Sequence, residues 1–174
     1  TRGWEDPANW TEFWCDVKAL FEWVVENVYY ARDDLHYVLP LEPNESLVMT
    51  CDFWQLPNET LALRRGDCED MSLLLASMLA AYAKNAVAVE CVVITEHVAT
   101  YMLFNDSTIC ILDPVAKYYT STGAPDYNIT SRDIAEEVEE WLEIWSSQIE
   151  NPRVKWAFSQ SLWRSFVNTE EFIE

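Results

Sequence analysis

Arg64–Met71 (RRGDCEDM) is the stretch that most constrains the fold, because it delivers a cysteine to the start of a strongly apolar helix. Gly66 permits a sharp turn, Asp67 is placed to cap the first free amides, and Asp70 completes a capping box. The following residues are apolar along one helical face: Met71, Leu74, Leu75, Met78, Leu79 and Tyr82. The pattern predicts a buried helix that starts at or near Cys68.

Cys68 is therefore a candidate nucleophile. The unpaired amides and the positive end of the dipole at a helix N-terminus stabilise a thiolate, which is the reactive form of cysteine. The carboxylates of Asp67, Glu69 and Asp70 oppose its ionisation. We therefore expect a base or a cation to assist this thiol; the alternative is a buried structural cysteine at a helix start.

The charge of the chain limits its partners. A net charge of −19, with only 11 basic residues, repels the phosphate backbone of nucleic acids. Cationic peptides, basic proteins and divalent cations fit this charge better, although excess carboxylates also serve solubility. No apolar run approaches the roughly 18 residues of a membrane span. The start at Thr1, without methionine, leaves room for a removed leader or anchor.

Sequons and cysteines favour an exported, cell-surface or extracellular glycoprotein. Five N-x-S/T sequons occur, at Asn9, Asn44, Asn58, Asn105 and Asn128, and several lie in turn-like segments, as a glycosylated surface requires. If Cys68 stays free for chemistry, an even set of four cysteines allows three disulfide pairings; these are Cys15, Cys51, Cys91 and Cys110. The alternative is that these four side chains are small buried hydrophobes.

Helices are predicted on both sides of a central sheet region. Apolar residues recur with a helical period from Trp10 to Val28, and we expect this helix to continue to Leu39, before Pro40. A short helical segment is expected at Glu59–Leu63. The residues that follow the cysteine helix are β-branched and predict three strands joined by hairpins: Ala86–Ile94, His97–Phe104 and Thr108–Leu112.

The C-terminal third is expected to be mainly helical. After a loop over Tyr118–Tyr127, a helix begins near Ser131 with its glutamates outward and its apolar residues inward. The inward residues are Ile134, Val138, Trp141, Leu142 and Trp145. Arg153–Phe158 is predicted as a fourth strand or an extended arm, and Ser161–Phe172 as a final helix.

These elements describe one α+β domain over residues 1–174, in which the cysteine helix packs on an antiparallel β-sheet with additional N- and C-terminal helices. Residues 1–46 would form an N-terminal helical cover, residues 47–118 the catalytic core, and residues 119–174 an acidic helical part.

His97 and Asp113 are the residues that we expect to meet Cys68. His97 opens the second predicted strand, and Asp113 closes the third. In an antiparallel meander these two positions lie at the same edge of the sheet, so the side chains can meet. If this edge faces the amino end of the cysteine helix, a thiol, an imidazole and a carboxylate stand in line. Cys68 would then attack, His97 would take and return the proton, and Asp113 would orient the imidazole.

At these residues the sequence resembles a known family. Trp54–Leu61 (WQLPNETL), Arg65–Asp70 (RGDCED), His97 and Asp113–Pro114 resemble the transglutaminase-like superfamily of papain-type thiol enzymes, most closely its microbial transglutaminase-like cysteine proteinases. The resemblance covers about residues 47–118. It implies a papain-like α+β fold and a Cys-His-Asp triad that transfers an acyl group through a thioester, which water or an amine resolves.

Other residues have weaker candidate roles. Gln55 or Trp54 could donate to the oxyanion beside the Cys68 amide, or belong to the core. No cofactor is required, but calcium could bind the hard oxygens of Asp67, Glu69 and Asp70, as acidic residues near the nucleophile do in some relatives, and would offset their charge. Zinc is disfavoured because the cysteines lack paired ligand spacing. His36 is expected to be structural or exposed.

The sequence thus predicts a thiol-dependent acyl-transfer enzyme, foremost a cysteine peptidase acting on a peptide or protein outside the cell. Amine transfer of the transglutaminase type is the alternative within enzymes. A module that binds peptide or glycan without catalysis is the alternative outside them, since the carboxylates around Cys68 could leave the thiol protonated and inert.

Overall fold

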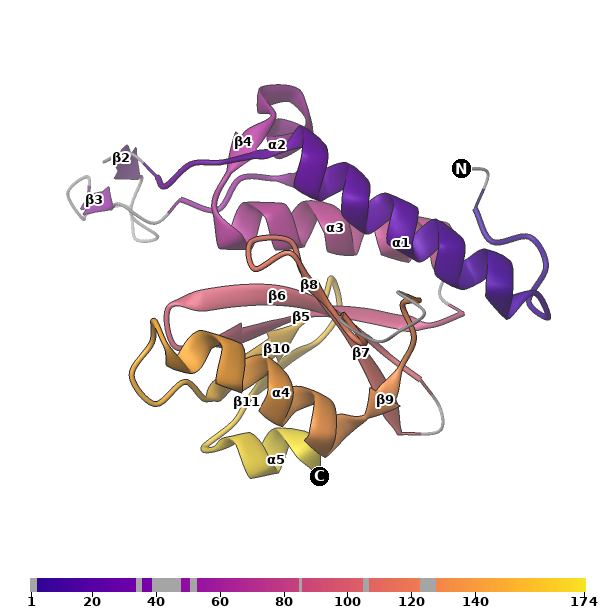
Figure 1. The fold of residues 1–174 in the computed structure, drawn as a ribbon. Helices are drawn as coiled ribbons and strands as arrows, with labels where there is room; N and C mark the ends of the chain where they lie inside the picture. Colours follow the sequence, from indigo (N-terminus) through magenta and orange to yellow (C-terminus); the bar gives the residue numbers. More distant parts are fainter. Residues whose placement is uncertain are drawn as a thin grey trace.

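The computed structural model describes residues 3–33, 36–38, 48–50, 53–84, 86–104, 107–122 and 128–174. Within these residues the chain is an α+β fold with three layers. The central sheet has the strand order β11 (Trp163–Ser165), β10 (Val154–Phe158), β5 (Ala88–Ile94), β6 (His97–Leu103), β7 (Thr108–Asp113) and β8 (Tyr118–Tyr119). A further strand, β9 (Arg132–Asp133), pairs with β7. In Figure 1, α1 (Trp10–Asn27) and α3 (Cys68–Ala83) cover one face of this sheet, and α4 (Ile134–Ser146) and α5 (Thr169–Ile173) lie on the other.

The helix α1 (Trp10–Asn27) begins where Asn9 caps it, because the Asn9 side chain accepts a hydrogen bond from the backbone N–H of Glu12 at 3.1 Å. It ends at Asn27, so the prediction that it continues to Leu39 is wrong. Instead, β1 (Tyr29–Tyr30) leaves the helix and pairs in parallel with β4 (Arg65–Gly66). The reason is tertiary, since a backbone partner from the cysteine turn replaces another helical turn.

Two short strands and a short helix precede the cysteine helix. The strands β2 (His36–Val38) and β3 (Val48–Thr50) form a separate antiparallel pair. The helix α2 (Pro57–Leu63) starts with proline in its first turn, and its C-cap residue is Arg64, whose φ of 57° lies in the left-handed region. The predicted short helix is confirmed, and it starts two residues earlier than expected.

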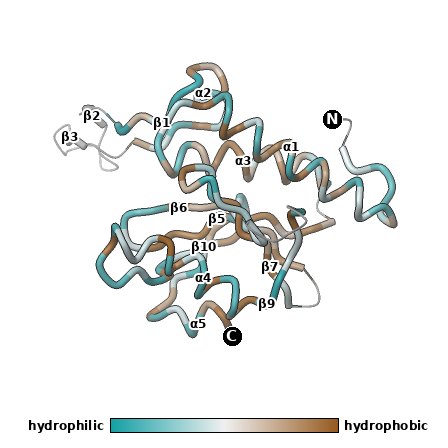
Figure 2. Tube along the Cα trace, viewed as in Figure 1, coloured by the Kyte–Doolittle hydropathy of each residue, from teal (hydrophilic) through white to brown (hydrophobic). Residues whose placement is uncertain are grey.

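The cysteine helix and the three hairpin strands are confirmed. The helix α3 (Cys68–Ala83) begins at the cysteine itself, with Asp67 as its N-cap residue. The strands β5 (Ala88–Ile94), β6 (His97–Leu103) and β7 (Thr108–Asp113) pair antiparallel in sequence order. Figure 2 shows hydrophobic residues concentrated in α3 and in the central strands.

The C-terminal third contains more sheet than expected. The helix α4 (Ile134–Ser146) is confirmed, and Asp133 caps it by accepting from the backbone N–H of Ala135 at 2.9 Å. The predicted fourth strand, Arg153–Phe158, is confirmed as β10 (Val154–Phe158), which pairs with β5. Short strands complete the sheet: β8 (Tyr118–Tyr119), β9 (Arg132–Asp133) and β11 (Trp163–Ser165).

The prediction of a final helix over Ser161–Phe172 is wrong. After β10 the chain turns back, with Ser159 N–H donating to the Leu162 carbonyl at 2.8 Å, and forms the edge strand β11. Only α5 (Thr169–Ile173) is helical. Pairing with β10 therefore overrides the local helical pattern.

The two faces of the sheet carry separate cores. The face toward α1 and α3 is closed by a cluster that includes Phe13, Leu75 and Leu112. The face toward α4 is closed by a cluster that includes Ile111 and Trp141, and Trp141 is among the largest fully buried side chains. Alternate residues of β7 serve the two cores, as the two-residue period of a strand requires.

The described cysteines are free thiols: Cys15, Cys68, Cys91 and Cys110. None of these four is in a disulfide, and Cys91 and Cys110 are buried, as the alternative of small hydrophobes predicts, whereas Cys15 is exposed. Cys51 lies outside the described residues. Among the described helices, none has the length and apolar character of a transmembrane segment.

The described sequon asparagines are on the surface. Asn9, Asn58 and Asn128 are exposed, which is the placement that glycosylation needs, and glycosylation itself stays a prediction. Asn44 and Asn105 lie outside the described residues.

Candidate active site

Asp70 holds the turn that presents Cys68. It is fully buried, and its Oδ1 accepts from the backbone N–H of Gln55 at 2.7 Å, while its Oδ2 accepts from the Gln55 side chain and, at 3.4 Å, from the backbone N–H of Asp67. Burial, together with the charge of Asp67, raises the pKa of Asp70 to about 6, against the hydrogen bonds from Gln55. Asp70 therefore stabilises the turn through its bonds to Gln55 and Asp67.

Gly66 is required by the close approach of Asp70. A Cβ atom at Gly66 would lie 2.5 Å from the Asp70 Cβ and 2.7 Å from its Oδ2. We expect Gly66→Ala to lower the free energy of unfolding by about 1–3 kcal/mol, because the added methyl overpacks the turn. Urea unfolding would measure the loss. Ala81→Ser, at an exposed position of α3, is the control; equal stability of the two variants would contradict the prediction.

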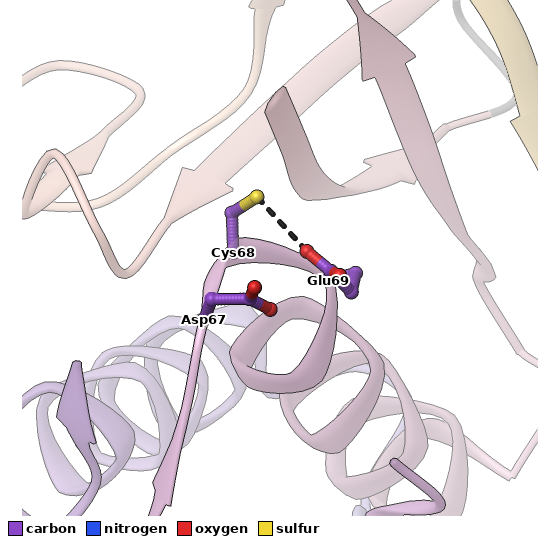
Figure 3. Close-up of side chains that lie close together, drawn as sticks. All are labelled: Asp67, Cys68 and Glu69. Carbon is purple, nitrogen blue, oxygen red and sulfur yellow. Dashed lines mark hydrogen bonds between the residues drawn. The ribbon is translucent and has the colours of Figure 1, made fainter. Parts of the chain in front are cut away.

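The Cys68 thiol contacts both its own helix and the sheet. Its Sγ donates to Glu69 Oε2 at 3.1 Å (Figure 3), and the backbone N–H of Val98 donates to the sulfur. Burial, followed by the charge and the hydrogen bond of Glu69, raises the pKa of the Cys68 thiol far above its ordinary value; the Val98 N–H acts in the opposite direction. The contact with Glu69 therefore favours the protonated form of the Cys68 thiol.

Side-chain hydrogen bonds fix the start of α3 to β6. Ser72 Oγ donates to the Val98 carbonyl at 3.0 Å, and Thr100 Oγ1 donates to the Ser72 carbonyl at 2.8 Å. All three residues belong to the buried interface of helix and sheet. This attachment holds the Cys68 sulfur beside Val98, the residue that follows His97.

His97 and Asp113 lie in contact, as their positions at one edge of the sheet predict. His97 Nε2 is 2.7 Å from Asp113 Oδ2, and the side chains are 3% and 0% exposed. Because Nε2 is bound to Asp113, Nδ1 is the ring nitrogen that remains to take the thiol proton. Nδ1 is also the ring nitrogen nearer to the backbone, and the backbone N–H of the next residue, Val98, binds the sulfur.

Asp113 accepts an unusually large number of hydrogen bonds. Its Oδ2 also accepts from Trp141 Nε1 and from Trp145 Nε1, each at 2.9 Å. Its Oδ1 accepts from the backbone N–H groups of Val115 at 3.1 Å and Ala116 at 3.0 Å. Burial opposes the ionisation of Asp113, but the hydrogen bonds and the proximity of His97 outweigh it, so its pKa lies below the ordinary value.

Trp141 and Trp145 also belong to the candidate site, although the sequence predicts them only as core residues. They come from α4, one turn apart, and the Trp145 ring lies over the His97 imidazole with centroids 3.8 Å apart and planes at 34°. Their spacing on one helical face was visible in the sequence, but it predicts burial alone. The requirement that a buried aspartate has hydrogen-bond donors would have identified them, since the indole N–H groups donate to Asp113.

The two residues proposed for the oxyanion are placed differently. Gln55 directs its side-chain amide to Asp70 and, at 3.4 Å, to the Arg65 carbonyl, so both of its N–H groups serve the turn. Trp54 is 37% exposed and packs against Phe158 with ring centroids 5.5 Å apart. The side chain of His36 lies outside the described ones.

Asp67, Cys68 and Glu69 are the described residues whose ligand atoms gather, all within 4.8 Å of one another (Figure 3). The cluster differs from the one that the sequence predicts, because Asp70 is bound to Gln55. Two carboxylates supply fewer oxygens than the six to eight, roughly, that calcium takes. Water or substrate oxygens would have to complete the shell of a calcium ion held by Asp67 and Glu69.

Comparisons with known proteins identify a matching family and similar solved structures. A family model described as a transglutaminase-like domain matches residues 12–143. Among solved structures, the chain is similar to Legionella pneumophila LapG, at 16% identity and a TM-score of 0.49, over 90% of this chain and 73% of that chain. Calcium-bound Legionella pneumophila LapG gives 16% identity and a TM-score of 0.47, over 86% and 68%. The search of curated proteins finds no match.

Proposed function

The chain belongs to the transglutaminase-like domain family, and we propose that it is a thiol-dependent acyl-transfer enzyme, foremost a cysteine peptidase, with Cys68, His97 and Asp113 as its catalytic triad. The buried His97–Asp113 pair, placed beside the residue that binds the Cys68 sulfur, carries this proposal. A buried imidazole held by an ionised carboxylate is the arrangement that general-base activation of a thiol requires.

In the proposed mechanism, His97 transfers the proton and Cys68 forms the covalent bond to the substrate. His97 Nδ1 takes the proton of Cys68, and the thiolate attacks the carbonyl carbon of an amide. The C–N bond then breaks, the imidazolium returns its proton to the leaving amine, and a thioester remains on Cys68. Water resolves the thioester in a peptidase, and a primary amine resolves it in a transglutaminase. The backbone N–H of Cys68, at the start of α3, is the proposed oxyanion donor.

Activation must overcome the carboxylates beside the thiol. The Glu69 contact stabilises the protonated thiol, so proton transfer to His97 has to break it. No cofactor is needed for this step. A calcium ion at Asp67 and Glu69 would neutralise part of the charge and favour the thiolate.

Alkylation by iodoacetamide tests the proposal without knowledge of the substrate. We expect Cys68 to react faster than Cys15 at about pH 6, with or without added calcium, because proton transfer to His97 overcomes the Glu69 contact and leaves a thiolate. Cys15 is an exposed thiol with no catalytic partner in the proposal. Peptide mass spectrometry would follow both cysteines in one sample. His97→Ala should remove the advantage of Cys68 and leave Cys15 unchanged. A Cys68 rate no higher than that of Cys15, both with calcium and with a chelator, would favour the non-catalytic binding module.

Glu69 gives a second expected result in the same assay. Glu69→Gln should lower the pKa of the Cys68 thiol and accelerate its alkylation near neutral pH, because it removes the charge and the ionised acceptor that retain the proton. Asp67→Asn should act in the same direction with a smaller effect, since Asp67 makes the smaller electrostatic contribution. A slower reaction in Glu69→Gln would show that this carboxylate assists the thiolate.

The setting of the substrate is part of the proposal. We propose a peptide or protein substrate outside the cell or at its surface, supported by the exposed sequons at Asn9, Asn58 and Asn128. Enzymatic removal of N-glycans from protein purified from its source would reveal glycosylation as a change in mass; an unchanged mass would contradict export through a glycosylating pathway.

A further inference from the structure

We propose that Trp141 and Trp145 of α4 are positioning residues for the thiol site, which they serve by fixing Asp113 and the plane of the His97 ring. The proposal deepens the proposed function and rests on it. It assigns to the C-terminal acidic part a share in the active site, where the sequence predicts only helical packing.

One carboxylate oxygen, Asp113 Oδ2, contacts His97 and both indoles. Asp113 Oδ2 accepts from His97 Nε2 at 2.7 Å and from the two indole Nε1 atoms at 2.9 Å each. An oxygen with three donors has no freedom to turn, and the other carboxylate oxygen is held by the backbone N–H groups of Val115 and Ala116. The two indoles thus hold the acceptor for His97 in place, together with these backbone groups.

The His97 imidazole also lies beside the two indole rings. The Trp145 ring lies 3.8 Å from the His97 ring, centroid to centroid, at an angle of 34°, and the Trp141 ring lies at 6.2 Å. His97 is therefore held in its plane by the Nε2 bond and from one side by an aromatic face. An imidazole that keeps this orientation presents Nδ1 in one direction only, so less orientational freedom has to be lost before Nδ1 takes the thiol proton.

The buried carboxylate of Glu137 holds α4 in position. Glu137, Trp141 and Trp145 lie four residues apart on one face of α4. Glu137 is fully buried, and its Oε1 accepts from the Tyr118 hydroxyl at 2.7 Å and from Thr120 Oγ1 at 2.6 Å. The carboxylate thus attaches the first half of α4 to the chain that follows Asp113. The indoles one and two turns later are brought to Asp113 by this attachment.

Trp145→Phe is the test, because phenylalanine keeps an aromatic ring over His97 but removes the N–H donor to Asp113 along with part of the indole ring. Trp4→Phe is the matched control: Trp4 and Trp145 are 7% and 8% exposed, but Trp4 lies in the core toward α1 and its Nε1 has no hydrogen-bond partner among the described residues. Both variants lose similar packing, so a merely structural role predicts similar behaviour.

Nitrogen NMR of the histidine rings gives a readout that does not depend on catalysis. The chain has two histidines, so a His36→Gln variant assigns the ring signals of His97. We expect Trp145→Phe to shift the His97 ring ¹⁵N signals and to lower kcat on casein by about tenfold with little change in KM, and Trp4→Phe to do neither.

The outcomes separate the two proposals. His97 signals and kcat in Trp145→Phe that match those of Trp4→Phe would overturn the positioning role and leave the triad in place. Absence of casein turnover in the wild type, together with a Cys68 alkylation rate no higher than that of Cys15, would overturn the proposed function. The NMR comparison would still report whether the indole N–H positions the imidazole. Unfolding midpoints of both variants in urea show that the compared proteins are folded.

Discussion

Cys68→Ala is expected to abolish acyl transfer while the protein stays folded. The proposed chemistry forms its covalent bond at this sulfur, and removal of a nucleophile from a triad costs about 10³-fold or more in kcat. The side chain is half-buried at the start of α3, and alanine fits the helix and removes the protonated thiol from Glu69. Casein cleavage, followed by mass spectrometry of the new termini, measures hydrolysis. Incorporation of monodansylcadaverine into casein measures amine transfer.

Cys15→Ala is the matched control, because it removes an exposed cysteine from a helix that carries no proposed catalytic residue. It should keep both activities of the wild type. Activity that persists in Cys68→Ala would refute the nucleophile. The ratio of cleavage to amine incorporation in the wild type would decide between peptidase and transglutaminase.

The cysteine turn and the hairpin strands could be predicted because their signals are local. Gly66, Asp67 and the apolar face after Cys68 specify a turn and a capped, buried helix without reference to the rest of the chain. Short connections between β-branched segments specify hairpins, and the hairpins bring His97 to Asp113. Sequence order alone was therefore sufficient to predict this contact.

The remaining features depend on partners distant in sequence. Tyr29–Tyr30 leaves the helical pattern because it pairs with Arg65–Gly66, and Trp163–Ser165 becomes a strand because β10 offers a free edge. Asp70 has the spacing of a calcium ligand in the sequence, yet Gln55 occupies its oxygens. In each case a tertiary contact chooses between two local possibilities, and no periodicity records that choice.

Asp113→Ala is expected to damage both activity and stability. It leaves the His97 Nε2, two indole N–H groups and two backbone N–H groups without their acceptor in a fully buried place. Breaking such a buried charged contact on one side costs about 3–5 kcal/mol, and the unoriented imidazole should lower kcat by about 10³-fold. Urea unfolding at pH 7 and the casein assay measure the two losses.

Because Asp113→Ala could unfold part of the site, Asp113→Asn provides the pH-dependent test. Folding lowers the pKa of Asp113, so its stabilising contribution is complete above the ordinary aspartate pKa of about 3.9 and is lost as the pH falls through the folded-state value. The difference in free energy of unfolding between the wild type and Asp113→Asn should therefore be largest near neutral pH and shrink below about pH 4. Glu150→Gln, at an exposed position, should show little difference at any pH. A gap that grows in acid would mean that Asp113 is protonated in the folded protein, and the imidazole would then lack the charge that the proposed mechanism assigns to its partner.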